Sequence, residues 1–170
     1  MVSSLFNPSL PSLEGISLPS LVPATPPFSV EGSLWPLLRV KLGRNATAAE
    51  FETYLEVRDQ WLERCEPHVC ILDVRDVHLP PTQLRLRYTA WLIEREAEMR
   101  RWSLGNVYVI QSPEVRMMMS LMRHSAHLAM PFVVTDTLPP GAAWAAARLQ
   151  EAGLAQAATR VRAAHGIAAS

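Results

Sequence analysis

The most constraining feature of this sequence is an apolar run near its middle, residues 69–74 (VCILDV). The run is rich in β-branched side chains, and Asp73 is its only polar residue. An apolar run without alternation predicts a strand in the centre of a sheet, covered on both faces. A chain of 170 residues, 49% of them hydrophobic, is long enough to bury one such sheet and too short for a second full domain.

Strand and helix patterns alternate on both sides of this run. The predicted strands are residues 37–42, 69–74, 107–110 and 132–134. The predicted helices are residues 47–65, 82–102, 112–125 and 142–149. Gly105 is expected to form the turn into the third strand. This order predicts an α/β fold with a central, mostly parallel sheet of about four to five strands and about four helices.

Two of the predicted helices begin with clear capping signals. Thr47 and Glu50 form a capping box, in which each side chain satisfies an amide group at the helix start. Ser112, Pro113 and Glu114 combine a serine cap, a proline in the first turn and a carboxylate near the positive helix end. These signals place the starts of the first and third helices.

The composition of the two ends differs from that of the middle. Seven of the fourteen prolines fall at or before Pro36, and proline at this density removes the donors that helices and sheets need. We therefore expect residues 1–33 to be a disordered arm. Because the arm is rich in leucine, it could also dock on a groove of its own domain or on a partner. Residues 153–170 are alanine-rich and are expected to form a loosely attached helical tail. Residues 34–152 then make the folded domain.

The charge balance and the cysteine usage exclude several classes of protein. Sixteen basic and sixteen acidic residues create no global field that would draw nucleic acid or an anionic membrane. Cys70 lies inside the apolar run, so Cys65 and Cys70 do not suggest a disulfide framework. The first basic residue is Arg39, and no stretch approaches the roughly 18 apolar residues of a membrane helix. We expect a cytoplasmic protein with no integral membrane segment.

Three segments of the chain carry a family resemblance. They are residues 69–77 (VCILDVRDV), residues 106–116 (NVYVIQSPEVR), and residues 132–136 (FVVTD) with Ala143, Trp144 and Leu149. In this order and at this spacing they resemble the central strand, the next strand and helix, and the ending of a STAS domain. This module is shared by anti-sigma-factor antagonists and the cytoplasmic ends of sulfate transporters. The resemblance covers about residues 35–152 and implies a bacterial stand-alone signalling protein that binds another protein, such as a regulatory kinase or an anti-sigma-like factor.

The resemblance also implies a regulatory position. In the antagonist branch, a serine or threonine at the start of the helix after the central strand is phosphorylated by a partner kinase, which breaks the partner complex. Here Thr82 is the hydroxyl at the matching place, while Gln83 replaces the glycine of the family's usual Asp-Ser-Ser-Gly. A phosphate at a helix N-terminus is electrostatically favourable. Thr82 is therefore a candidate phosphorylation site, and its alternative role is to cap the helix.

The residues leave three kinds of functional site open. The first is a partner interface at the corner after the central strand and on the third helix, made by His78, Gln83, Arg85, Met117 and Leu121. The second is a small-ligand pocket or enzyme site at the strand ends, where open α/β sheets bind ligands, made by Asp73, His78, Ser112 and Asp136. The third is a structural subunit docked through the N-terminal arm.

No residue pattern points to a catalytic centre, a metal or a cofactor. His124 and His127 are three residues apart, but a metal site needs at least a third ligand. The apolar setting of Cys70 argues against a reactive thiolate. The sequence has neither a G-x-x-x-x-G-K-[ST] nor a G-x-G-x-x-G phosphate-binding motif. We therefore expect a non-enzymatic protein without a cofactor.

Overall fold

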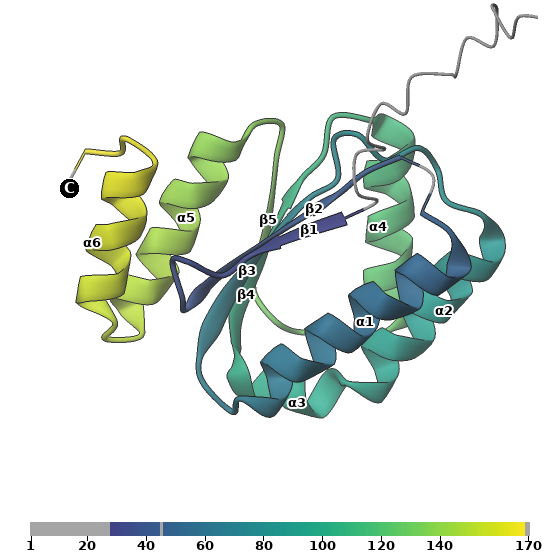
Figure 1. Cartoon of the computed structure of the whole chain (residues 1–170), viewed down its shortest axis with the longest axis horizontal. Helices are drawn as coiled ribbons and strands as arrows, with labels where there is room; N and C mark the ends of the chain where they lie inside the picture. The colour runs from purple at the N-terminus through teal and green to yellow at the C-terminus, as the bar shows by residue number, and fades with distance from the viewer. Residues whose placement is uncertain (1–27, 45, 169–170) are drawn as a thin grey trace, which may run out of the picture.

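The computed structural model describes residues 28–44 and 46–168. In these residues a single sheet lies between helices on both of its faces (Figure 1). The strands are β1 (Phe28–Glu31), β2 (Leu37–Leu42), β3 (His68–Asp73), β4 (Ser103–Val109) and β5 (Phe132–Thr135). The helices are α1 (Ala48–Glu63), α2 (Thr82–Glu94), α3 (Glu96–Trp102), α4 (Pro113–Ser125), α5 (Leu138–Glu151) and α6 (Ala155–Ala164).

The strands lie in the sheet in the same order as in the chain, from β1 to β5. β1 is antiparallel to β2, and β2 to β5 are parallel to one another. β3 is the middle strand and all six of its residues are buried. The α/β class and the mostly parallel sheet are therefore confirmed, with six helices in the described residues where about four were expected.

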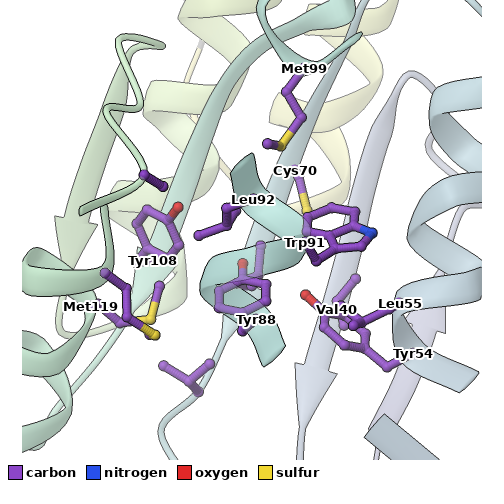
Figure 2. Close-up of a cluster of buried hydrophobic side chains, with 14 of the residues drawn as sticks. Val40, Tyr54, Leu55, Cys70, Tyr88, Trp91, Leu92, Met99, Tyr108 and Met119 are labelled. Atoms are coloured by element: carbon purple, nitrogen blue, oxygen red, sulfur yellow. The ribbon is translucent and has the colours of Figure 1, made fainter. Parts of the chain in front are cut away.

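The alternation of side chains along the strands gives the sheet two separate cores. Leu38, Cys70 and Tyr108 belong to the core under α1, α2, α3 and α4, together with Tyr54, Tyr88 and Trp91 of the helices. Figure 2 shows these rings gathered with Cys70 in that core. Leu37, Val69 and Val107 belong to the opposite core, which α5 and α6 cover with alanines and Leu149. Figure 1 shows the two groups of helices on opposite sides of the sheet.

The capping predictions are confirmed, but the second helix differs from expectation. Thr47 and Glu50 form the capping box, and the Ser112 hydroxyl accepts a hydrogen bond from the Val115 amide at 3.2 Å. The helix expected over residues 82–102 is broken into α2 and α3 at Arg95, whose backbone leaves the helical region (φ −103°). The Arg95 side chain is bound at this break by Asp59 of α1, with Nε to Oδ1 at 2.8 Å.

Gly105 lies inside β4 and does not form the expected turn. Its φ is +151°, and a Cβ at this position would lie 2.5 Å from the Trp144 ring. The register between β3 and β4 also shifts at this point, because His68 pairs with Ser103 and Val69 pairs with Gly105. The glycine therefore permits the close approach of α5 to the sheet.

Both ends of the folded part extend further than expected. β1 begins at Phe28, inside the segment expected to be an arm, and Phe28 pairs with Leu42. Residues 1–27 lie outside the described residues, and the hypothesis that the arm docks on a groove or a partner concerns these residues. In the expected loose tail, α6 instead packs against α5 with Ala157, Ala158 and Val161 buried. No helix in the part of the chain that the structure describes is long and apolar enough to span a membrane.

Candidate functional site

An apolar cavity of about 130 Å³ lies at the carboxyl ends of β2 and β3. Its walls come from three helices of one layer, with Phe51 and Tyr54 from α1, Leu84 and Tyr88 from α2, and Met118 and Met122 from α4. Residues 77–81, the loop before α2, form another part of its lining. The position agrees with the tendency of open α/β sheets to bind ligands beyond the carboxyl ends of their strands.

Few groups in the cavity lining carry charge. Arg85 is its one arginine and His78 its one histidine, and no aspartate or glutamate lines it. The Arg85 Nη2 atom donates a hydrogen bond to the Thr82 Oγ1 at 2.8 Å. The Arg85 Nε atom is buried and has no hydrogen-bond acceptor among the described residues. Because a buried donor without an acceptor is costly, this atom is unusual in a folded protein.

The corner after β3 is held by ion pairs. Asp73 is fully buried, and Arg75 binds both of its carboxylate oxygens, at 2.8 and 2.7 Å. Arg39 lies on the neighbouring strand, with its Nη2 at 3.7 Å from Asp73 Oδ2. Burial alone raises the pKa of Asp73, but the hydrogen bonds and charge of Arg75, with the charge of Arg39, hold that pKa below its ordinary value. The Asp73 carboxylate therefore serves the corner's structure.

Thr82 is the first residue of α2 and is exposed. The N-cap position belongs to Pro81, and no side chain caps this helix. Thr82 therefore does not cap the helix, because α2 begins at Thr82 itself, one residue earlier than a cap at this position requires. Gln83 and His78 are also exposed on this corner.

Adjacent helices α2 and α4 expose large apolar side chains on the side away from the sheet. These are Leu86 (65% exposed), Ile93 (56%), Met117 (68%) and Leu121 (62%), and we call them the outer apolar face. Met117 and Leu121 are among the predicted interface residues, whereas the exposure of Leu86 and Ile93 is not predicted. Leu86 and Ile93 are seven residues apart, on the face of α2 opposite the buried Tyr88 and Trp91. This spacing is the sequence pattern from which their exposure could have been predicted.

The four predicted pocket residues, Asp73, His78, Ser112 and Asp136, differ in their relation to the cavity. Only His78 lines the cavity. Ser112 caps α4, Asp73 is bound by Arg75, and the exposed Asp136 is bound by Arg116 at 2.7 Å. His124 and His127 are both exposed at the end of α4. Among the described residues, no group of three or more His, Cys, Asp or Glu side chains is placed to hold a metal ion.

Cys70 is buried in the core that also holds Tyr54 and Trp91, in agreement with its apolar surroundings in the sequence (Figure 2). Burial raises the pKa of its thiol, although the nearby Arg58 guanidinium opposes this shift. A buried thiol with a raised pKa is a poor nucleophile. Cys70 therefore acts as a small apolar side chain of the core.

Comparisons of the chain with protein-family models, with curated proteins and with solved structures found no match. The fold and the site define the protein as an α/β domain with a sheet covered on both faces. Two features of this domain call for a functional explanation. They are the outer apolar face on α2 and α4 and the apolar cavity at the strand ends.

Proposed function

We propose that this protein is a non-catalytic STAS-like module that regulates a bacterial signalling pathway by binding another protein through the outer apolar face. The observation that carries this proposal is the exposure of four large apolar side chains on two adjacent helices. Contiguous exposed apolar surface is characteristic of sites that bind other proteins. Met117 also supplies a flexible thioether, which adapts to the shape of a partner.

The position of Thr82 relative to this face supports regulation by phosphorylation. Thr82 is exposed and lies four residues before Leu86 in α2, so the two residues are neighbours on the helix surface. A phosphate on Thr82 would add about 1.5 to 2 negative charges beside an apolar contact. It would also lie at the positive end of α2 and within reach of Arg85, which already hydrogen-bonds the Thr82 hydroxyl. A partner kinase or an anti-sigma-like factor fits this arrangement.

The test is a pull-down from a lysate of the native host, with the wild-type chain and the variants Leu86→Glu and Met117→Glu. Each variant places a carboxylate on the outer apolar face, so the same partner should be lost from both. Gln156→Glu, at an exposed position of α6 on the far side of the sheet, is the matched control and should retain it.

Two further variants test the regulatory part of this proposal. Thr82→Glu should weaken partner binding, whereas Thr82→Ala should leave it unchanged. If the wild type and all four variants at Thr82, Leu86 and Met117 recovered identical partners in equal amounts, the outer apolar face would not be the binding surface. If Leu86→Glu and Met117→Glu lost the partner but Thr82→Glu and Thr82→Ala bound it equally well, the outer apolar face would be retained as the binding surface. The phosphorylation switch at Thr82 would then be rejected.

A further inference from the structure

We propose that the cavity at the carboxyl ends of β2 and β3 binds a small amphipathic carboxylate, with the carboxylate on Arg85. The body of the ligand would be an aryl ring or a short acyl chain inside the cavity. This site lies beneath α1, α2 and α4, whereas the outer apolar face points away from the sheet. The inference is therefore independent of the proposed partner interface.

The volume and the walls of the cavity define the apolar body of the ligand. A closed apolar cavity of about 150 Å³ binds benzene, and the present cavity measures about 130 Å³. Its aromatic walls include Phe51 and Tyr88, and Met118 and Met122 add polarisable thioethers that adjust to a ligand. Because a cavity lowers stability in proportion to its volume, a ligand that fills it stabilises the folded state.

The polar groups of the cavity define the headgroup. The buried Arg85 Nε has a hydrogen to donate and no acceptor among the described residues, and a carboxylate oxygen would supply one. His78 is the one histidine in the lining, and no acidic side chain there would repel an anion. α2 begins beside the cavity without a side-chain cap, so its first amides also favour a negative charge.

The loop before α2 provides the route by which such a ligand enters. Val77, Leu79 and the two prolines at positions 80 and 81 line the cavity, and Leu79 is exposed to solvent over about half of its surface. An apolar side chain at the rim lets the hydrophobic end of a ligand arrive first. The carboxylate then remains near Arg85 at the start of α2.

The methionines of the chain offer a direct test. We would label the methionine methyl groups with ¹³C in the full chain and titrate it with sodium benzoate, sodium hexanoate and neutral benzyl alcohol. The methyl signals of Met118, Met119 and Met122, which line the cavity, should shift. Those of Met117, which is exposed, and Met99, which is buried outside the cavity lining, should stay in place. Ligands of this size bind with dissociation constants of about 1 mM or somewhat below.

Variants then separate the headgroup from the body of the ligand. Arg85→Gln should weaken benzoate about tenfold and leave benzyl alcohol unchanged, because only the charged hydrogen bond is lost. Arg101→Gln, on the exposed surface of α3, is the matched control. Val77→Phe should weaken both ligands by filling the cavity. If Arg85→Gln does not fold, Arg85→Lys keeps the charge, removes Nε, and should also weaken benzoate.

Three results would overturn the inference. The first is that neither benzoate nor hexanoate shifts the methyl signals of the methionines that line the cavity. The second is an equal shift at Met117 and Met99, which would mean that the carboxylates bind outside the cavity. The third is an unchanged benzoate affinity in the folded Arg85 and Val77 variants. None of these results depends on whether a protein binds the outer apolar face.

Discussion

Arg75 binds both carboxylate oxygens of Asp73 from a position two residues further along the chain. Its Nε donates to Oδ1 at 2.8 Å and its Nη2 donates to Oδ2 at 2.7 Å, while the carboxylate itself is fully buried. Arg75 and Arg39 keep the pKa of Asp73 below its ordinary value although burial opposes this. The unfolded chain has a pKa of about 3.9 at this residue. Since the folded pKa is lower, the pair stabilises the fold fully above about pH 4 and ceases to do so as the pH falls through the folded pKa.

We therefore predict that Asp73→Asn lowers the free energy of unfolding by about 1 to 3 kcal/mol at neutral pH. It should also reduce the loss of stability between about pH 5 and pH 2. Urea unfolding at several pH values measures both effects. Asp76→Asn is the control, because Asp76 pairs with Lys41 on the exposed surface and its loss should cost less than about 1 kcal/mol. If the two substitutions lowered the free energy of unfolding equally, the buried Asp73–Arg75 pair would contribute no more than an exposed ion pair.

His68 should make stability depend on pH in the mildly acidic range. It is buried, its Nδ1 lies 2.9 Å from the Glu66 carbonyl oxygen, and its ring stacks on Trp35. Burial lowers the pKa of His68, although the Glu66 carbonyl opposes the shift. The pKa of a histidine in the unfolded chain is about 6.5. The contribution of neutral His68 to the free energy of unfolding is therefore complete above this pH, and it is lost as the pH falls through the lower pKa of the folded state.

The wild type should consequently unfold at a lower urea concentration at about pH 5.5 than at about pH 7.5. His68→Gln should show a smaller difference between these two conditions, because it has no proton to take up. His124→Gln, at an exposed position, should behave as the wild type does. A pH dependence that is the same in all three proteins would assign the effect to other groups.

Gly105→Ala should be strongly destabilising. The added Cβ would lie 2.5 Å from the Trp144 ring and 3.1 Å from the Pro131 carbonyl oxygen, and the φ of +151° is rare for an L-residue. We expect a loss of about 2 to 4 kcal/mol in the free energy of unfolding. Gly166→Ala separates the two causes, because its φ is +63° but nothing lies within 4 Å of the added atom. That control should lose only about 1 kcal/mol, and a similar loss at both positions would show that backbone strain alone is responsible.

Arg58 should be replaceable by an apolar side chain of similar length. It is buried, has no carboxylate partner within the described ranges, and hydrogen-bonds the Tyr54 hydroxyl at 2.9 Å beside the Trp91 ring. Removing a buried charge that lacks an acidic partner removes a desolvation cost. Arg58→Met should leave the melting temperature unchanged or raise it, whereas Arg58→Ala should lower stability by about 2 to 4 kcal/mol through a cavity. If both variants lost equal stability, the interaction of the guanidinium with the aromatic rings would be the dominant one.

The elements that the sequence predicts well are those with local signals. The apolar run at β3 and the caps at Thr47 and Ser112 depend only on neighbouring residues. The break at Arg95 was not predictable, because Arg95 binds Asp59, 36 residues earlier. The packing of α6 onto the domain is not evident from the sequence, because each of its alanines contributes little hydrophobicity. Their small size nevertheless allows α6 to pack closely.

The candidate site was harder to predict than the fold. The cavity is assembled from α1, α2, α4 and the loop before α2, and each wall residue looks like an ordinary core residue in its own segment. The polar residues singled out at the strand ends instead bind their own neighbours, as Asp73 binds Arg75 and Asp136 binds Arg116. Arg85 lies in the first turn of α2, as its place in the sequence implies, but the burial of its Nε atom depends on the surrounding packing.

The order of the strands also has a consequence for synthesis. Since each strand from β2 to β5 pairs with the strand made just before it, the sheet can grow in the direction in which the ribosome releases the chain. The helices of one face are interleaved with the strands and emerge along with them. α5 and α6 emerge after β5, so Leu37, Val69 and Val107 remain uncovered on the other face until then. A nascent chain that stalls after β5 would carry a finished sheet with one bare side, and it would depend on chaperones until α5 and α6 were made.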